Sequence, residues 1–534
     1  MSQFTDPERP RLLFNSDGGS AAVYAFEPPI TRDQLCRVID SLAGTHVDVY
    51  IGCVSEGSFF CHDTKIGEVY GFDTPDDEFE SQNFRRWADN IRGLIQSGND
   101  PVTVWADRAH AAGMKFWPSM RMNDIHKDWS ERWPSLRTRW ELARPHVRLG
   151  HEAPERYKRR YPRPGMASDG FSWAFDFSVD EVRQLKVDVI EELCTGYDID
   201  GFELDFLSHP MYFKEGRERS GAPYLTEMMR EVRAVVRRAG AAKGRELTLL
   251  ARVLPSEEQC LAIGMDVRTW AAEGLVDALA PAVRGYLNMT PDVSGMVALG
   301  HEHGCQVYGG TSDLWVPYYT AYPDRDGKRN PRASVPMFRA AAARLWHAGV
   351  DAIHVFNYDC HSTGIQHHSV EEHVGLDDVP LFNPDEYRIL TEIGDREGIA
   401  RRDKHYVVAH DVDRRSGGPD EPLPVDLAEP GQAAEIDLTV ADDLDAAGSD
   451  GALAGVVLRI TLAGYREGTD RLHVELDGKP LACEASGQKL RCGDVPARQG
   501  ANRLRIVLDE RAGEPGEPLR IDGVELIVTY RDGA

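Results

Sequence analysis

Residues 197–210 read YDIDGFELDFLSHP and alternate apolar with acidic side chains. Residues two apart in a β-strand share a face, so Glu203 and Asp205 point to one side and Phe202 and Leu204 to the other. This alternation suits a closed barrel, in which the apolar face meets helices and the other face lines the lumen. Buried carboxylates cost free energy unless they are paired, so two of them on one inward face require a partner or a function.

Seven further apolar runs rich in β-branched residues occur along the chain, and helix-like segments separate them. The expected strands cover residues 12–16, 47–54, 115–120, 201–206, 247–253, 276–280, 306–309 and 352–357. Strand–helix alternation predicts a parallel sheet, and eight repeats predict a (β/α)8 TIM barrel over residues 1–400. The alternative, an open doubly wound sheet, would carry a glycine-rich phosphate loop after its first strand, and the chain has no such motif there.

A different pattern occupies residues 401–534, where strand-like segments follow one another at short intervals. Turn signals such as Asp477-Gly478 separate them, and period-two alternation runs through residues 472–476. These features predict a C-terminal β-sandwich that serves as an accessory domain. A helix around residues 385–397 is expected to join it to the barrel.

The charge balance of the 534 residues constrains the partners. Lys and Arg number 61 against 87 Asp and Glu, giving a net charge of −26. Binding to nucleic acid or to an anionic membrane requires a basic patch, so neither partner is expected. The chain also has no apolar run approaching the ~18 residues needed to cross a bilayer. An oligomer remains possible.

Cysteine usage and the first residues bear on the compartment. The nine cysteines include no CxxC pair, which is typical of reduced thiols in a cytoplasmic protein. Cys483 and Cys492 stand where a hairpin disulfide is possible, although free thiols are the expectation. No basic start followed by an apolar run opens the sequence, so no secretory signal is expected and the protein is expected to be cytoplasmic.

Glycoside hydrolysis on a barrel requires two carboxyl groups, one acting as acid and one as nucleophile or base. Asp205 ends the expected fourth strand, at the rim where barrel active sites lie, and is expected to be the nucleophile or base. Glu203 is expected to be the acid or a charge-tuning neighbour, because two nearby carboxylates raise the pKa of one of them. A purely structural network of this pair with Arg121 or Arg252 is the open alternative.

Several motifs resemble the family-10-like glycosyl hydrolase group, a set of bacterial barrel proteins. They are Asp200-Gly201 with Asp205-Phe206 and Pro210, together with NSDGG, THVDVYIGCVSEG, HDTKIGEVYG and RMND earlier in the chain. The likeness covers most of residues 11–400 and implies a barrel enzyme that acts on glycosidic bonds.

Two other barrel families fit the fourth strand less well. Chitinases carry DGxDxDxE there, and their acid would fall on Leu207, which has no proton to donate. Families with Asn-Glu on this strand would need Asn before the carboxylate, where this chain has Leu204.

The residues that follow the expected strands suit sugar recognition, because they combine partners for hydroxyl groups with aromatic rings that stack on sugar faces. The expected substrate-binding residues are Asp17, Arg121, Asn123, Asp124, His126, His209, Arg252, Tyr286, Asp313, Trp315 and Asn357. A long insertion after the third strand, residues 123–173, holds several Trp and Tyr residues and is expected to roof the site.

The second carboxylate is left open by the sequence, with Asp124, Glu257 and Asp313 as alternatives to Glu203. No metal and no cofactor are expected. His301 and His303 form an HxH pair, but residues two apart on a helix do not face one ligand.

The predicted function is hydrolysis of glycosidic bonds in short oligosaccharides or small glycosides. The alternatives are a non-catalytic carbohydrate-binding barrel and a metal-dependent hydrolase or lyase, in which Asp17, Asp124 and Asp205 would hold a divalent ion.

Overall fold

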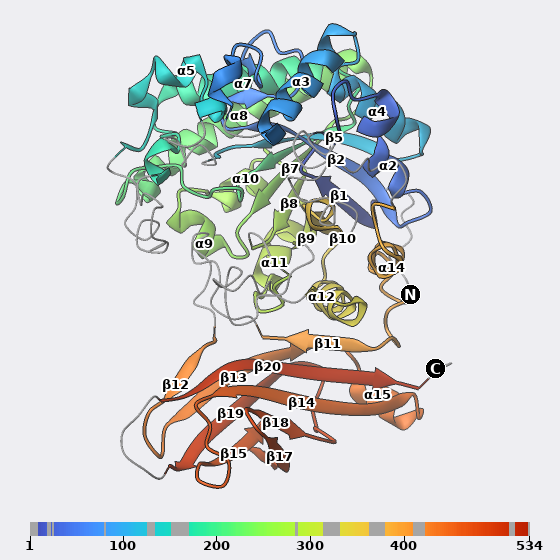
Figure 1. The fold of residues 1–534 in the computed structure, drawn as a ribbon, viewed down its shortest axis with the longest axis vertical. Coiled ribbons are helices and arrows are strands. Elements are labelled where there is room, and N and C mark those ends of the chain that lie inside the picture. The colour runs from blue at the N-terminus through green and yellow to red at the C-terminus, as the bar shows by residue number, and fades with distance from the viewer. Residues whose placement is uncertain are drawn as a thin grey trace.

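The structure is a computed structural model, which describes residues 9–18, 23, 26–79, 82–124, 134–150, 170–283, 287–312, 332–362, 380–408, 422–511 and 518–531. A body of strands and helices and a body of antiparallel strands follow each other along the long axis of the molecule (Figure 1). None of the described helices is long and apolar enough to cross a bilayer.

Eight parallel strands of the described chain close into a barrel, because the first pairs with both the second and the last. They are β1 (Leu12–Ser16), β2 (Val47–Glu56), β5 (Lys115–Arg121), β6 (Gly201–Asp205), β7 (Thr248–Val253), β8 (Ala278–Pro281), β9 (Gln306–Thr311) and β10 (Ala352–Phe356). Two short strands, β3 (Phe59–Phe60) and β4 (Glu68–Val69), extend the sheet beyond β2. The sequence prediction of a (β/α)8 barrel is confirmed, with all eight strands close to their expected positions.

Helices surround the barrel and follow the strands in the order expected of (β/α) repeats (Figure 1). The longer ones are α3 (Gln82–Gln96), α4 (Pro101–Ala111), α7 (Asp180–Gly196), α8 (Glu218–Lys243), α11 (Ser294–Glu302), α12 (Val335–Ala348) and α14 (Pro384–Glu392). Shorter ones include α9 (Glu257–Ala262) and α10 (Val267–Ala272).

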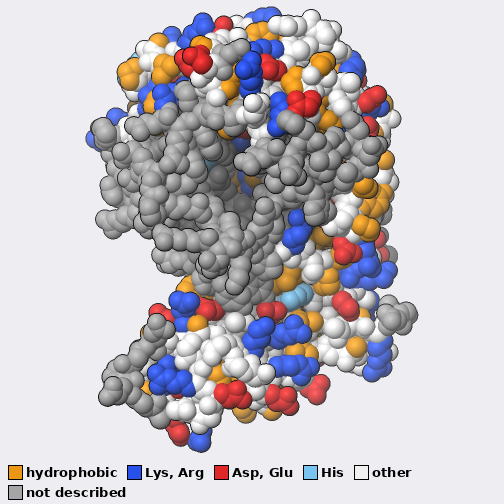
Figure 2. Space-filling view, in the orientation of Figure 1, with side chains coloured by type: hydrophobic (Ala, Val, Ile, Leu, Met, Phe, Trp, Pro, Cys, Tyr) orange, Lys and Arg blue, Asp and Glu red, His pale blue; other side chains and the backbone are white. Residues whose placement is uncertain are grey.

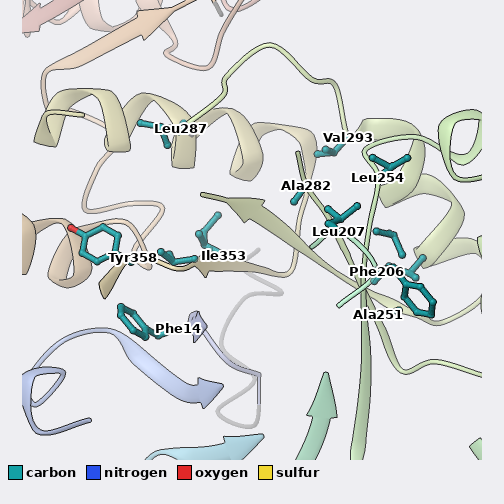
Figure 3. Close-up of a cluster of buried hydrophobic side chains, with 14 of the residues drawn as sticks. Phe14, Phe206, Leu207, Ala251, Leu254, Ala282, Leu287, Val293, Ile353 and Tyr358 are labelled. Atoms are coloured by element: carbon teal, nitrogen blue, oxygen red, sulfur yellow. The ribbon is translucent and has the colours of Figure 1, made fainter. Parts of the chain in front are cut away.

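Outward-facing side chains of the strands pack against these helices in one large apolar cluster. Phe14, Ala251 and Ile353 reach this cluster from three different strands (Figure 3). Each fully buried side chain of the size of Phe or Leu stabilises the fold by about 1.5–3 kcal/mol, so this layer supplies much of the stability of the barrel.

The inward-facing side chains change character along the barrel axis. The floor of the lumen is a separate apolar cluster that includes Leu13, Trp117 and Leu250. Two residues further along their strands, the same faces carry Asn15, Ser119 and Arg252, so the lumen becomes polar toward the carboxyl ends. The polar residues therefore stand at the end of the barrel where barrel active sites lie.

Two antiparallel sheets form the C-terminal β-sandwich, as the sequence predicted. One sheet contains β11 (Lys404–Val407), β12 (Val425–Leu427), β14 (Leu453–Ala463), β17 (Cys483–Ser486), β18 (Lys489–Cys492) and β20 (Leu519–Tyr530). The other contains β13 (Ala433–Val440), β15 (Arg471–Leu476), β16 (Lys479–Leu481) and β19 (Gly500–Glu510). Figure 1 shows β11 running beside α12, so the sandwich lies against the helical layer of the barrel.

The expectation that all cysteines are free thiols is wrong for one pair. Cys483 and Cys492 are joined by a disulfide, with their Cα atoms 4.2 Å apart. They lie directly opposite each other in the hairpin of β17 and β18, and this register brings their side chains together. Cys36, Cys53 and Cys61 are among the thiols that remain free.

Candidate active site

Glu203 and Asp205 both point into the barrel, as the alternation of their strand predicts. Glu203 bonds with side chains of β1, β5 and β10, which it can reach only through the lumen. The two carboxylates form two levels, because Glu203 pairs in register with Ser119 of β5 and Asp205 pairs with Arg121 of the same strand.

The lower level is a hydrogen-bond network around Glu203, which is fully buried; Asn15 Oδ1 and His354 Nδ1 in this network have no partner among the described residues. Oε1 accepts hydrogen bonds from Asn15 Nδ2 and Ser119 Oγ, each at 2.6 Å, and Oε2 lies 2.6 Å from His354 Nε2. Burial alone would raise the pKa of Glu203, but His354, Ser119 and Arg252 outweigh this effect and the pKa is lowered. The sequence argument expected proximity of the two carboxylates to raise the pKa of an acid, and for Glu203 the direction is the reverse.

The upper level holds Asp205, which is 1% exposed. Its Oδ1 accepts hydrogen bonds from the Leu207 backbone N–H at 2.8 Å and from Arg252 Nη1 at 2.9 Å. Its Oδ2 is buried and has no hydrogen-bond partner among the residues that the structure describes. Asp205 is therefore fixed in position through one oxygen while the other is left for a ligand or for water.

Arg252 connects the two levels. It is fully buried, its guanidinium carbon lies 3.6 Å from the centre of the Phe356 ring, and its charge also acts on Glu203. Its Nε and Nη2 have no partner within the described chain. The purely structural network considered from the sequence is thus present in part, because Arg252 and Asp205 form a buried ion pair. Nε and Nη2 of Arg252 and Oδ2 of Asp205 take no part in that pair.

Beside Asp205, a second cluster gathers three carboxylates around Arg121. Arg121 forms ion pairs with Asp17, with Glu56 at 3.2 Å and with Asp124 at 3.3 Å. Burial would lower the pKa of Arg121, but the carboxylates hold it well above its ordinary value. Three carboxylates therefore gather around one guanidinium next to the Asp205 level. We call Arg121, Asp17, Glu56 and Asp124 the rim cluster.

The other predicted binding residues that the structure describes divide into two groups. Asn357 joins the rim cluster, since its Nδ2 lies 3.4 Å from an Asp17 oxygen, and His209 follows β6 beside Ser208, whose Oγ lies 3.4 Å from Asp124. Asn123 instead bonds backbone groups only: its Nδ2 donates to the carbonyls of two loops and its Oδ1 accepts from a backbone N–H. It fixes loops around the site and has little capacity left for a ligand.

Four predicted binding residues, His126, Tyr286, Asp313 and Trp315, lie outside the described residues. The same holds for much of the long insertion after β5, residues 125–133 and 151–169. Of its aromatic residues, Trp173 packs under the Arg148 guanidinium at 3.6 Å and Trp140 packs edge-on against Phe175. These two rings contribute to packing within the insertion.

The DG pair of the motif performs a structural role at the opposite end of β6. Asp200 accepts a hydrogen bond from the Phe116 backbone N–H at 2.9 Å and lies 2.7 Å from His110 Nε2. A Cβ at Gly201 would stand 2.6 Å from the Thr248 carbonyl oxygen, so only glycine fits there. Asp200 and Gly201 therefore stabilise the start of β6 and lie away from the rim.

Two further sequence candidates lie away from the rim. Glu257 forms an ion pair with Arg268 on the surface, and hydrogen bonds from Arg268 lower the pKa of Glu257. His301 pairs with Asp351 at 2.9 Å. Within the described residues, no group of three or more His, Cys, Asp and Glu side chains is arranged to hold a metal ion.

Sequence reasoning missed Ser119 and Phe356 as parts of the site. Both face the lumen, because they lie an even number of residues from Arg121 and His354 on their strands. The alternation of side chains along β5 and β10 therefore indicated that both residues face the lumen. They were not predicted as site residues because neither side chain carries a charge.

Comparison with known proteins gives only distant similarities. No family model matches the chain, and no curated protein matches it. Similar solved structures include α-L-fucosidase isoenzyme 2 from Paenibacillus thiaminolyticus, with 11% identity, a TM-score of 0.40 and coverage of 76% of this chain and 51% of that one. The GH36 α-galactosidase AgaA from Geobacillus stearothermophilus shows 12% identity, a TM-score of 0.34 and coverage of 95% and 56%.

A putative α-L-fucosidase from Bacteroides thetaiotaomicron has 10% identity, a TM-score of 0.34 and coverage of 98% of this chain and 96% of that one. The chain spans about half the length of the Paenibacillus and Geobacillus proteins. At these values the function has to be inferred from the site itself.

Proposed function

We propose that this protein is a glycoside hydrolase that cleaves glycosidic bonds in short oligosaccharides or small glycosides. The observation that carries the proposal is the half-satisfied carboxylate of Asp205 at the carboxyl end of β6. A buried acceptor without a partner costs stability, so its presence at the end of the barrel where active sites lie is best explained by a reacting ligand.

Asp205 acts as the nucleophile or base in this proposal. Its Oδ2 attacks the anomeric carbon or takes a proton from the water that attacks there, while Arg252 and the Leu207 N–H hold Oδ1 in place. In either case the bond from the anomeric carbon to the glycosidic oxygen breaks as the second carboxyl group protonates that oxygen. Fixing one oxygen directs the other toward the substrate, which lowers the entropic cost of reaching the reactive geometry.

Asp124 is the described carboxylate best suited to be the second carboxyl group. It lies beside the Asp205 level, because it contacts Arg121, which pairs in register with Asp205, and Ser208, at 3.3 and 3.4 Å. Glu203 is a poor acid because its pKa is lowered and both of its oxygens are engaged. Its role in the proposal is to place a negative charge beside Arg252, which donates a hydrogen bond to Asp205.

Sugar binding in the proposal relies on Arg121, Asp17 and Asn357 as partners for hydroxyl groups. Figure 2 shows Lys or Arg side chains deep in the barrel half of the molecule, on the face toward the viewer.

The rival function is a barrel that binds a carbohydrate without cleaving it. It is favoured by the Asp205–Arg252 ion pair, because a carboxylate committed to a buried arginine can serve structure alone. Both functions predict sugar binding at the rim, and only hydrolysis predicts turnover.

The deciding experiment screens the purified protein against aryl glycosides and short oligosaccharides and compares Asp205→Asn with Glu257→Gln. We expect Asp205→Asn to lower kcat by roughly 10²–10⁴-fold, the range for loss of an acid or base, and Glu257→Gln to leave kcat unchanged. Circular dichroism and thermal unfolding verify that each variant is folded. Binding of a sugar without turnover, measured by calorimetry, would establish the rival; undiminished kcat in folded Asp205→Asn would refute the assignment.

A further inference from the structure

A cavity of about 320 Å³ lies where the β-sandwich meets the barrel. Its walls come from the ends of β8 and β9, from the start of α11, from α12, and from β13 and β19 of the sandwich. Neither Asp205 nor any residue of the rim cluster lines it. The volume falls at the lower end of the range for small-molecule sites.

Most of the cavity wall is apolar. Ala282 and Val293, labelled in Figure 3, line it together with Met289, Leu345 and Pro281. An apolar wall with a few polar groups is the usual composition of a site for a small organic molecule.

Arg344 of α12 is the charged donor in this wall. Its Nε is buried without a hydrogen-bond partner, and its Nη2 reaches the carbonyl oxygens of Thr290 and Pro291 only at 3.5 Å each. None of the described carboxylates forms an ion pair with it. Burial lowers the pKa of Arg344 to about 10, which shows that its charge is poorly compensated.

Thr311 adds a second unsatisfied group. It ends β9, is 5% exposed and lines the cavity, and its Oγ1 has no hydrogen-bond partner in the described part of the chain. A buried hydroxyl and a buried guanidinium nitrogen without partners are each costly, and a ligand in the cavity can satisfy both.

Asp292 also lines the cavity, and its negative charge acts on Arg344. Its oxygens accept hydrogen bonds from the Ser294 backbone N–H and Oγ, each at 2.9 Å, at the start of α11. Asp292 forms no ion pair with Arg344, because Ser294 at the start of α11 holds its carboxylate. The guanidinium therefore remains available to an external anion.

We propose that this cavity binds a small organic anion, with Arg344 contacting its oxyanion group and the apolar wall contacting its body. The oxyanion is a carboxylate, sulfate or phosphate, all of which match the donor geometry of a guanidinium. The site is separate from the rim, and the proposal does not depend on glycoside hydrolysis.

The sign of a stability change distinguishes a binding role for Arg344 from a structural one. A half-buried cation with an unpartnered Nε destabilises the fold, so we expect Arg344→Met to raise the thermal midpoint of the protein without ligand or leave it unchanged. If Arg344 served the fold through the two carbonyl contacts, the same substitution would lower the midpoint.

The binding test uses calorimetry and thermal unfolding of the full chain with acetate, benzoate, glucuronate and inorganic phosphate at millimolar concentrations. We expect saturable binding of at least one probe and a ligand-dependent rise of the thermal midpoint. Arg344→Met should weaken that binding by about tenfold or more, because it removes a charge-assisted hydrogen bond. Tighter binding of benzoate or glucuronate than of acetate supports contact between the cavity wall and the body of the anion, and binding of phosphate alone overturns the proposal of an organic anion.

Arg459→Met is the matched control, because Arg459 is exposed on β14 and lies outside the cavity lining. It removes the same net charge and should leave binding unchanged. Equal binding by wild type and Arg344→Met, or no saturable binding of any probe, overturns the proposal. A lower thermal midpoint of ligand-free Arg344→Met assigns Arg344 to the fold and overturns it as well.

Discussion

Glu203 and Asp205 stand two residues apart on one strand and face the same lumen, yet their surroundings differ. Both oxygens of Glu203 have short contacts, to Asn15, Ser119 and His354. Asp205 has partners on one oxygen only. Burial is nearly complete for both, so the two carboxylates differ in the completeness of their hydrogen bonding and not in their burial.

Under the proposed function, we expect the Glu203 level to serve stability and the Asp205 level to serve the chemistry. The lower network connects β1, β5, β6 and β10 across the lumen, so it holds opposite sides of the barrel together. The upper level is left with an unused acceptor and unused donors of Arg252. Asn15 Oδ1 and His354 Nδ1 of the lower network also lack partners among the described residues, so the contrast lies in the carboxylates themselves: both oxygens of Glu203 are bonded and one oxygen of Asp205 is not.

The largest effect on stability is expected from Glu203→Gln. The substitution removes a buried charge opposite His354 and places an amide NH2 group against its Nε2, so we expect a loss of about 3–5 kcal/mol of unfolding free energy. Urea denaturation measures it. Asp205→Asn also removes a charge opposite the buried Arg252. It should cost less, because the Asn oxygen still accepts from Arg252 and the Leu207 N–H and the charge of Glu203 still acts on Arg252. A larger loss for Asp205→Asn would reverse the comparison.

The pH dependence of stability follows from the lowered pKa of Glu203. A carboxyl group whose pKa is lower in the folded state stabilises the fold above its unfolded-state pKa of 4.5, and this contribution is lost as the pH falls through the folded-state value. The difference in unfolding free energy between wild type and Glu203→Gln should therefore shrink as the pH falls from neutral to about 3. A difference that grows on acidification would contradict the lowered pKa.

A smaller effect is expected from Ser119→Ala, which removes one of the hydrogen bonds to Glu203. Hydrogen bonds to charged groups contribute about 1.5–3 kcal/mol, and Asn15 still bonds the same oxygen, so the loss should fall at the lower end of that range. Urea denaturation gives the stability and aryl glycoside hydrolysis the activity. An unchanged kcat together with lowered stability supports separate roles for the Glu203 and Asp205 levels. A lowered kcat together with unchanged stability contradicts them.

Much of the barrel was predictable because its signals are local. Strands alternate or are uniformly apolar, helices repeat with their own period, and these patterns gave all eight strands. The inward direction of Glu203 and Asp205 also follows from alternation alone. The disulfide was missed because its formation depends on the register of β17 and β18, which two isolated cysteines do not reveal.

The partners of the site residues were not predictable to the same degree. Asp205 contacts Arg252 because β6 and β7 pair with these two residues opposite each other, and a shift by one residue would turn one of them outward. Asn123 seemed a binding residue because it follows a strand, but its amide bonds three backbone groups. Position after a strand indicates the rim, and only the structure shows which groups there are already used.

Glu257 illustrates the same limit and gives the smallest expected effect. It follows β7 at the carboxyl end, as a rim residue would, but it begins α9 and its side chain, 40% exposed, pairs with Arg268 of α10. Exposed ion pairs contribute between about 0 and 1 kcal/mol, so Glu257→Gln should change the unfolding free energy by less than about 1 kcal/mol. Urea denaturation of Glu257→Gln, Arg268→Met and the double variant measures the coupling, which should weaken further with added salt. A coupling as large as the loss in Glu203→Gln would show that exposure does not separate the two kinds of carboxylate.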